Sequence, residues 1–392
     1  MSSILHPLQG HEAERAILAR AIRLGTLPSS LLFHGARGVG KQRLALWTAQ
    51  LLLCEQQGVE PCDGCRSCKL ALGLQHPDVH WHFPLVRPKG VNADKLADAL
   101  EQARYEALAA RRGGPVRYQS FDDPAGIYVA AVQALRRRAH TRPAMGREQI
   151  FIVGDADALV SQEASPEAAN ALLKLLEEPP NDTRFILTSS EPGRLLPTVR
   201  SRTVPLHVGS IPTETVLRFL VDVAGFGRAE AERAARLGGG SIGRALGFLP
   251  DDADVVQLDK MRGRAREILR AALTGRRQDA FVAAIGFPPT GARALVELMD
   301  FLDESLRDLA AISAGAPEQA ADPEAAALFA KALEGAIVDP VDAARGLAAV
   351  ERARELARGN VNPQLLVFGL VEDLRRLLRG RTRGTARSGA RP

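Results

Sequence analysis

Residues 31–42 read LLFHGARGVGKQ, an apolar run followed at once by a glycine-rich loop that carries a lysine. The loop matches the pattern G-x-x-x-x-G-K, whose fixed positions are Gly35, Gly40 and Lys41, with a further glycine at Gly38. Glycines here let backbone N–H groups approach phosphate oxygens, and the helix that follows adds the positive end of its dipole. Lys41 would reach the outer phosphates as a point charge. The stretch predicts a phosphate-binding loop between a strand and a helix, rather than a glycine-rich turn without a ligand.

The residue after the lysine departs from this pattern. A Ser or Thr hydroxyl normally stands there and ligates the magnesium ion that accompanies the nucleotide, whereas this chain has Gln42. A glutamine amide is longer than a hydroxyl and cannot take the same coordination geometry without rearrangement. We therefore expect productive placement of Mg²⁺ to be lost, while the binding of ATP itself stays open.

A second apolar run, residues 149–153, is followed by Gly154, Asp155 and Ala156. An acidic residue that closes such a strand fits a second NTPase motif, in which Asp155 would face the magnesium ion. Considered alone, Asp155 fits a helix cap equally well. The active enzymes of this class carry a glutamate next, which polarises the attacking water, but Ala156 can neither accept a proton nor orient a water. The two departures together predict an ATPase-derived fold that has lost hydrolysis.

The four cysteines of the chain, Cys54, Cys62, Cys65 and Cys68, all fall within fifteen residues. Four thiolates in short knuckle-like turns suit a tetrahedral zinc ion. A disulfide is disfavoured in a cytosolic chain, and a four-cysteine iron–sulfur centre is the remaining alternative. Because all four ligands would come from the protein, no coordination position would stay open for catalysis. We expect a structural zinc site.

The length and patterning of the chain predict more than one domain. The 392 residues exceed one ordinary domain. Apolar runs at 31–34, 78–83, 149–153, 184–189 and 204–208 alternate with helical segments, which is the pattern of a parallel α/β sheet. From 254 to 378 the periodicity is helical throughout. Residues 84–126 are irregular around one helical piece and resemble a surface insertion.

Composition limits the cellular setting and the partners. No run of about 18 apolar residues and no signal-peptide pattern occur, so we expect a cytoplasmic protein without a membrane partner. The net charge of +5 is modest and permits contact with DNA phosphates without demanding it. Only 5% of the residues are aromatic, which argues against a surface built for base stacking.

Three further segments carry a resemblance to a known family. NALLKLLEEPP (170–180), LLPTVRSRT (195–203) and GSIGRAL (240–246) resemble segments of the bacterial DNA polymerase III clamp-loader subunits, which are AAA+ proteins. The resemblance runs from about His6 to Leu378, and Thr203 stands where the family has a cysteine. It implies an α/β AAA+ domain (1–209), a helical lid (210–250) and an all-α collar (251–379) that assembles the subunits into a ring. The remaining residues, 380–392, are expected to be a disordered basic tail.

The resemblance also implies roles for individual residues. Arg202 corresponds to an arginine finger that enters the ATP site of a neighbouring subunit and stabilises charge on the transferred phosphate. Arg244 is either a sensor of bound nucleotide or a solvated residue of the lid. The family's delta-prime subunits typically lack the Ser/Thr hydroxyl that Gln42 replaces and the glutamate that Ala156 replaces. They also carry the run seen here as His76-Pro77-Asp78.

The implied function is that of a stator-like clamp-loader subunit without ATPase activity of its own. Its partners would be the delta and gamma/tau subunits and, through the complex, the sliding clamp and primed DNA. One alternative is an active gamma/tau-type ATPase, against which Gln42 and Ala156 argue. An alternative from another class is a zinc-dependent nucleic-acid-binding module that retains a vestigial nucleotide fold.

Overall fold

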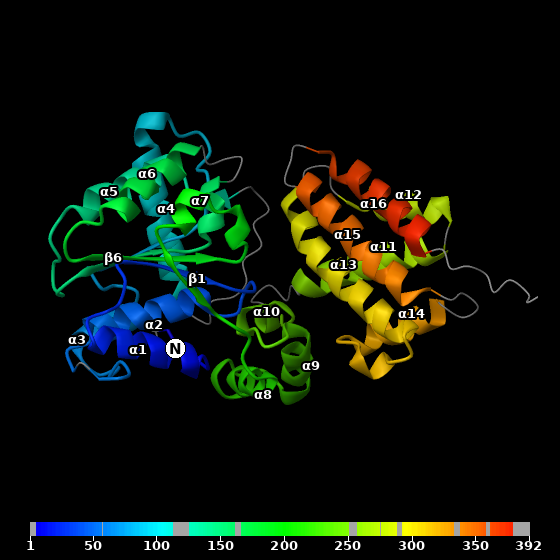
Figure 1. Cartoon of the computed structure of the whole chain (residues 1–392), viewed down its shortest axis with the longest axis horizontal. Coiled ribbons are helices and arrows are strands. Elements are labelled where there is room, and N and C mark those ends of the chain that lie inside the picture. The colour runs from blue at the N-terminus through cyan, green and yellow to red at the C-terminus, as the bar shows by residue number, and fades with distance from the viewer. Residues whose placement is uncertain are drawn as a thin grey trace, which may run out of the picture. The chain divides into compact units, whose positions relative to one another are not determined.

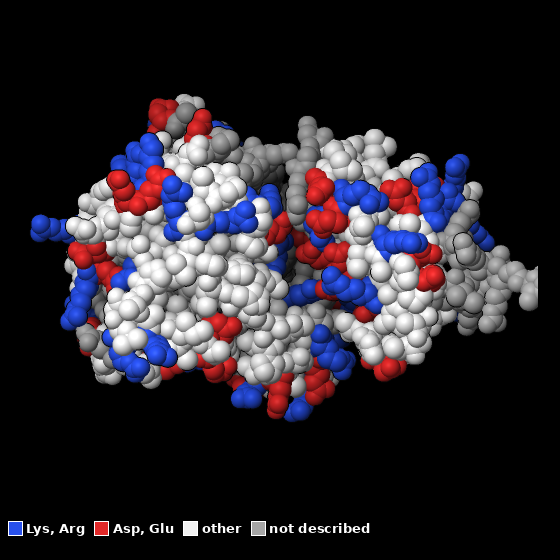
Figure 2. Space-filling model, in the orientation of Figure 1, with Lys and Arg blue, Asp and Glu red and all other residues white. Residues whose placement is uncertain are grey.

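The computed structural model describes residues 5–56, 58–112, 125–160, 166–250, 257–274, 276–287, 292–332, 338–357 and 361–378 (Figure 1). It divides into two compact units, Met1–Leu249 and Pro250–Pro392. The first unit combines a sheet with helices, and the described part of the second is helical. On the face drawn in Figure 2, basic and acidic side chains are interspersed over both units, as expected for a modest net charge.

A five-stranded parallel sheet forms the centre of the first unit, with the strand order β2-β5-β6-β1-β7. Its strands are β1 (Ser30–His34), β2 (Val79–His82), β5 (Gln149–Val153), β6 (Thr183–Ser189) and β7 (Val204–His207). Side chains of β1, β5 and β6 are buried on both faces, so these strands appear in the sequence as continuous apolar runs. The predicted α/β sheet is confirmed.

Helices cover both faces of this sheet (Figure 1). The elements of this part are α1 (Glu12–Arg23), α2 (Lys41–Leu53), α3 (Arg66–Leu72), α4 (Leu96–Arg111), α5 (Val129–Ala139), α6 (Pro166–Glu177) and α7 (Pro197–Arg200). One apolar core joins α1 and α2 to the sheet, and the other joins α5 and α6 to the opposite face. The phosphate loop leaves the sheet at the carboxyl end of β1, between these layers.

The segment predicted as an insertion, 84–126, contains the expected helix as α4. It also contains two strands of two residues each, β3 (Leu85–Val86) and β4 (Ala125–Gly126), which pair in antiparallel fashion and were not predicted. Strands this short leave too little alternation to be recognised in a sequence. Leu96 and Leu100 of α4 pack with Tyr128, so the insertion is attached to the start of α5.

Residues 210–249 form a small helical group within the first unit. Its elements are α8 (Thr213–Arg218), a π-helical turn (Phe219–Val223), α9 (Arg228–Gly238) and α10 (Ile242–Gly247). Gly240 is required where α9 turns into α10, because its φ is +78° and a Cβ would lie 2.4 Å from the carbonyl oxygen of Ile211. These residues cluster with the sheet rather than apart from it, and their treatment as a separate lid stays a prediction.

The second unit contains α11 (Gln257–Thr274), α12 (Arg277–Ile285), α13 (Ala292–Ser313), α14 (Pro323–Ala332), α15 (Pro340–Ala357) and α16 (Pro363–Leu378). The start of α16 is capped by Asn362, whose Oδ1 accepts the backbone N–H groups of Gln364 and Leu365, at 2.9 and 3.2 Å. The predicted tail, 380–392, lies outside the described residues. Among the described residues, no helix is long and apolar enough to cross a lipid bilayer.

The His76-Pro77-Asp78 run fastens the start of β2 to two other segments. The His76 ring contacts the Ser67 hydroxyl of α3 at 3.3 Å. The buried Asp78 carboxylate accepts the backbone N–H groups of Ala144, Met145 and Gly146 at 2.6–2.8 Å. Burial raises the pKa of Asp78, but these hydrogen bonds outweigh it and hold the pKa below its ordinary value.

Replacement of Asp78 should therefore destabilise the protein in a pH-dependent way. We expect Asp78→Asn to lower the free energy of unfolding by about 1–3 kcal/mol at pH 7, as for a buried group that loses charged hydrogen bonds. Because the folded-state pKa is depressed, this stabilisation is present above the unfolded value of about 4 and is lost as the pH falls through the folded value. Urea unfolding measured from pH 7 to pH 3 should show that the free energies of unfolding of the unmodified protein and of the Asp78→Asn variant approach each other as the pH falls.

The exposed residue Asp98 of α4 provides the control for this measurement. Asp98→Asn removes the same charge without the buried hydrogen bonds, so it should change stability little at any pH. A constant difference between the Asp78→Asn variant and the unmodified protein across this range would contradict the assigned role.

Candidate functional site: a closed phosphate loop, a remote arginine and a four-cysteine cluster

The predicted phosphate loop lies between β1 and α2, as the sequence indicates. Gly38 has a φ of +75°, and a Cβ on it would lie 2.9 Å from the backbone nitrogen of Arg244. Gly40 has a φ of +112° and directly precedes α2. Both positions therefore need glycine for their backbone conformation, and Gly38 needs it also for its close approach to α10. The loop has the glycine-dependent geometry that phosphate binding requires.

Lys41 is buried, and its ammonium contacts the loop from which it comes. Its Nζ donates to the carbonyl oxygens of Gly35 and Ala36, at 2.9 and 2.8 Å, and to Ser190 Oγ at 3.1 Å. Burial lowers the pKa of Lys41 to about 8, against the opposing effect of nearby carboxylates of which Asp155 is the first. The three donors of the lysine are thus directed to protein oxygens.

Gln42 fills the space in which the pattern places a magnesium-ligating hydroxyl. Its Nε2 donates to Asp155 Oδ2 at 3.1 Å, and its Oε1 accepts the indole N–H of Trp81 at 3.0 Å. Its amide also lies against Gly154, where a Cβ would come within 2.6 Å of Oε1. The Gln42 amide therefore binds the carboxylate that a metal ion would use. It is held in place by Asp155, which follows β5, and by Trp81 of β2.

Asp155 lies at the carboxyl end of β5, next to the phosphate loop. Burial raises the pKa of Asp155, as does the charge of Asp157, while Lys41 lowers it. Its side chain accepts a hydrogen bond from Gln42, a contact that a helix cap alone would not explain. The next residue, Ala156, is fully buried in the core that contains α6. A glutamate there would place a charge among apolar side chains, which is costly.

Three hydroxyl residues at the end of β6 belong to this site and were not predicted. Thr188 Oγ1 accepts the backbone N–H of Asp155 at 3.0 Å, and Ser189 Oγ donates to Asp157 at 2.8 Å. Ser190 accepts from Lys41, as described above. A run of small hydroxyl residues at the carboxyl end of a predicted strand was the available signal, because the carboxyl ends of parallel strands meet at one edge.

The start of α10 packs directly on the phosphate loop. The backbone N–H of Gly243 donates to the carbonyl oxygen of Gly38 at 3.1 Å, and Ser241 Oγ donates to that of Arg37 at 3.3 Å. Arg244 follows in the same turn, with its guanidinium carbon 5.9 Å from the centre of the Phe248 ring. The helix that carries Arg244 is thereby brought to the loop, and the role of Arg244 as a nucleotide sensor stays a prediction.

Arg202 lies at the opposite edge of the sheet from the phosphate loop. It lies two residues before β7, whose first residue, Val204, pairs with Leu31 in the amino-terminal half of β1. The phosphate loop follows the carboxyl end of β1, about 13 Å farther along at about 3.3 Å per residue. Arg202 Nη2 forms an ion pair with Glu177 Oε1 at 2.7 Å, and about a third of the arginine side chain is exposed.

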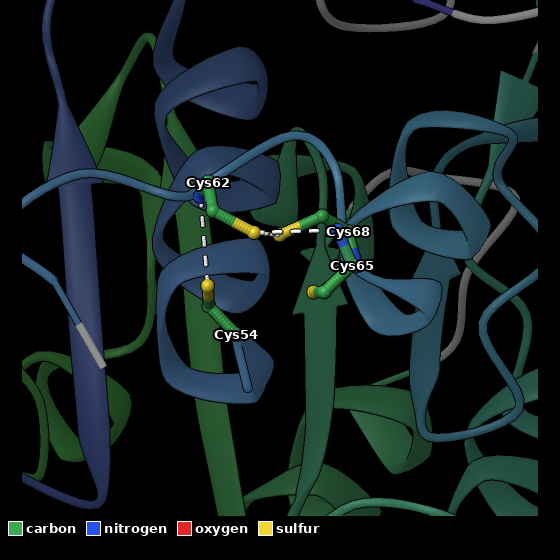
Figure 3. A group of neighbouring side chains, drawn as sticks. All are labelled: Cys54, Cys62, Cys65 and Cys68. Carbon is green, nitrogen blue, oxygen red and sulfur yellow. Dashed lines mark hydrogen bonds between the residues drawn. The ribbon is translucent and has the colours of Figure 1, made fainter. Parts of the chain in front are cut away.

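The four cysteine sulfur atoms converge at one point between α2 and α3 (Figure 3). They lie within 4.8 Å of one another, and those of Cys62 and Cys68 are 3.9 Å apart. A tetrahedral zinc ion with bonds of about 2.3 Å separates its sulfur ligands by about 3.8 Å, so the arrangement fits the ion. Backbone N–H groups of Cys65 and Cys68 point at neighbouring sulfur atoms, at 3.3 Å each, which suits thiolates.

A zinc ion held there would act as a structural cross-link. Cys54 follows the end of α2, while Cys65 caps α3 and Cys68 lies in its first turn. The same connection is supported by Gln50 of α2, which donates to Asp63 at 2.6 Å. The cluster is separate from the phosphate loop, and four thiolate ligands would leave no coordination position of the ion open.

A model of the family described as DNA polymerase III, delta subunit, matches residues 10–212, about half of the chain. The chain belongs to this family. The matched range contains the phosphate loop, the cysteine cluster, Asp155 and Arg202, and it leaves out Arg244. The match confirms the resemblance to the clamp-loader delta-prime branch of the AAA+ proteins that the motifs indicate.

Individual relatives come from two clamp-loader subunit types. The delta' subunit of DNA polymerase III from Bacillus subtilis is 31% identical over 47% of this chain and 44% of its own. The gamma/tau subunit from Mycobacterium tuberculosis is also 31% identical, over 55% of this chain and 30% of its own. This chain spans about half the length of the delta' relatives that come first, from 44% to 58% of them.

Among solved structures, a gamma subunit-related protein of DNA polymerase III from Thermotoga maritima is 15% identical, with a TM-score of 0.41. The alignment covers 93% of this chain and 99% of that chain. The assignment of the AAA+ family rests on the family match and on the parallel sheet with its phosphate loop.

We predict one zinc ion per chain. Cys62→Ser or Cys68→Ser should each abolish the zinc content measured by elemental analysis, because three remaining thiolates hold the ion far less well. The chain has only these four cysteines, so a thiol reagent should detect four groups after the metal is chelated. Circular dichroism should show the sheet largely intact. A protein without zinc, or one with an iron absorption band, would refute the assignment.

We predict that the purified chain hydrolyses ATP negligibly, well below roughly 1 s⁻¹, since the metal position and the catalytic carboxylate are both replaced. Gln42→Thr restores a hydroxyl but should not restore turnover, because Ala156 still offers no base. The variant should also unfold more easily, by about 1–2 kcal/mol, because two hydrogen bonds of the amide are lost. Gln102→Thr, at an exposed position of α4, is the matched control for stability. Turnover above this limit in the unmodified protein would overturn the prediction.

Proposed function

We propose that this chain is a delta-prime-type, stator-like subunit of the DNA polymerase III clamp loader. In this role it hydrolyses no ATP itself and supplies Arg202 to the ATP site of a neighbouring subunit. The complex would use that ATP to load a sliding clamp onto primed DNA in the cytoplasm. Its partners would be the delta and gamma/tau subunits, and association would involve the helical second unit as a collar.

The position of Arg202 carries this proposal. The strand register puts Arg202 at the edge of the sheet away from its own phosphate loop. An arginine there lies too far from its own phosphate loop to contact a nucleotide held by the same chain, which supports a role toward a nucleotide held by another chain. Its partial exposure supports such access, since the side chain can leave Glu177 without uncovering a buried carboxylate. Surface ion pairs of this kind contribute little to stability.

The chemistry of a guanidinium fits this task. Negative charge spreads over the phosphoryl oxygens as the bond to the leaving group breaks, and a planar, permanently charged donor stabilises it. An interaction that strengthens in the transition state raises the rate more than the affinity for ATP. Arg202 would therefore act on turnover in the neighbouring subunit rather than on nucleotide binding.

The alternative of an active gamma/tau-type ATPase is less well supported. Relatives of that type match the chain too, so similarity alone does not separate the two. The contacts of Gln42 favour the non-hydrolysing role, because its amide already binds Asp155. The burial of Ala156 favours it as well, because no carboxylate is available to activate water. A zinc-dependent nucleic-acid module has no comparable observation in its favour.

The Arg202→Ala variant tests the proposal in a loader reconstituted from the subunits of the same organism. We expect the DNA- and clamp-stimulated ATPase rate to fall while the complex still assembles, as judged by co-elution. An arginine finger contributes about 10³–10⁵ in rate at the site it serves. The loss in bulk turnover should be smaller, because other ATP sites in the loader keep their own arginines.

Arg228→Ala is the control, since Arg228 is 77% exposed and pairs only within α9, with Glu232. It should leave both assembly and clamp loading unchanged. If the Arg202→Ala loader remains whole and loads clamps at the unmodified rate, Arg202 is a structural residue and the proposed mechanism fails.

A further inference from the structure

A second basic site lies in the first unit, away from the phosphate loop. A cavity of about 490 Å³ opens between β2, α4 and α5, and its ionisable lining is His80, His82, Glu101, Arg104, Arg137 and Arg138. This volume is within the range of small-molecule sites, about 300–1,000 Å³. Two strands, β5 and β6, separate β2 from β1, so the cavity is roughly 14 Å across the sheet from the phosphate loop.

Arg138 is held rigidly in one wall of the cavity. Its Nε donates to His80 Nε2 at 3.3 Å, its Nη1 to Thr141 Oγ1 at 2.8 Å, and its Nη2 to the carbonyl oxygen of Pro77 at 3.2 Å. The Asp78 carboxylate lies 3.9 Å from Nη2 and is already engaged by three backbone N–H groups. Because His80 accepts from Arg138, its ring is neutral in this arrangement.

Arg104 faces this wall from α4. Its Nε and Nη2 bond to the Glu101 carboxylate at 3.2 and 2.7 Å, and its Nη1 donates to the carbonyl oxygen of Trp81 at 3.4 Å. Burial, and then the neighbouring arginines, lower the pKa of His80 to about 4, and burial keeps the pKa of His82 well below its ordinary value. The lining therefore presents three guanidinium groups against one carboxylate.

The segment of sequence beside the cavity is also positively charged. Residues 136–147 read RRRAHTRPAMGR, with five arginines and no acidic residue. The helix dipole favours a basic last turn of α5, and Glu101 pairs with Arg104, but two further guanidinium groups of the lining have no carboxylate of the lining to balance them. A ligand that balances charge from α4 and α5 together must be an anion. The planar fork of guanidinium matches phosphate oxygens in geometry as well as in charge.

We propose that this cavity binds the phosphoryl group of a phosphorylated small molecule no larger than about a mononucleotide. Arg104 and Arg138 approach the anion from opposite walls, and the exposed Arg137 completes the site at its mouth. His80 is a positioning residue that fixes Arg138. The proposal is independent of the role of Arg202. The same phosphoryl chemistry is present in a nucleic-acid backbone, so the experiment compares the two sources.

Calorimetric titration of the full-length chain, without divalent metal and at low salt, tests the site. The probes are inorganic pyrophosphate, adenosine monophosphate and a single-stranded oligonucleotide. We expect saturable binding of one small phosphorylated probe per chain, weakened about tenfold or more by Arg137→Gln, since a charge-assisted hydrogen bond is lost. Arg136→Gln removes the same charge from an exposed neighbour that does not line the cavity, and it should have no comparable effect.

Lys41→Gln identifies any binding at the phosphate loop: binding that this variant abolishes and Arg137→Gln leaves intact belongs to the loop. If the oligonucleotide binds with the same dependence on Arg137 and the small probes do not, phosphoryl recognition holds and its source is a nucleic-acid backbone. Absence of binding by all three probes overturns the proposal. So does an equal loss in the Arg136→Gln and Arg137→Gln variants, which indicates general charge, and so does binding that depends on Lys41 but not on Arg137.

Discussion

The hydrogen bond from the Gln42 amide to Asp155 is the contact on which the interpretation of the nucleotide site depends. It joins the phosphate loop to the end of β5 at the place where an active NTPase would hold magnesium between the same two elements. Trp81 holds the other end of the amide from β2. A hydrogen bond between two side chains of the protein thus lies where an active NTPase has a metal-dependent link.

The parallel sheet separates the phosphate loop from Arg202, the residue proposed to act on a neighbouring subunit. The phosphate loop, with Lys41, Asp155 and the hydroxyl groups of β6, lies at the carboxyl edge of the strands. Arg202 lies at the amino edge, at the entrance to β7. A loss of hydrolysis at one edge would leave the other edge unaffected, because the Arg202 guanidinium is supported by Glu177 of α6 and by Thr198 of α7, which lie outside the phosphate loop. This separation is what the proposed role requires of a subunit that does not hydrolyse ATP itself.

Local pattern was sufficient for the sheet and for the cysteine cluster. The strand 149–153 was predicted at its observed bounds, because its unbroken apolar run ends sharply at Gly154. The cysteine spacing fixed the candidate ligands without any knowledge of the fold. The sequence could not predict contacts between side chains that are distant along the chain, such as the hydrogen bond of Trp81 to Gln42 or the ion pair of Glu177 with Arg202. No periodicity encodes which side chains meet across strands. The basic cavity was not predicted for the same reason, whereas β3 and β4 were missed because two residues are too few to show alternation.

The proposal under test is that this chain completes the ATP site of another subunit while hydrolysing no ATP itself. The most direct measurement is the ATP turnover of the gamma/tau-type subunit from the same organism, titrated with this chain in the presence of clamp and primed DNA. The account predicts that turnover rises and saturates at a fixed molar ratio, and that this chain alone contributes none. A turnover that does not respond to the added chain, or hydrolysis by the chain in isolation, would contradict it.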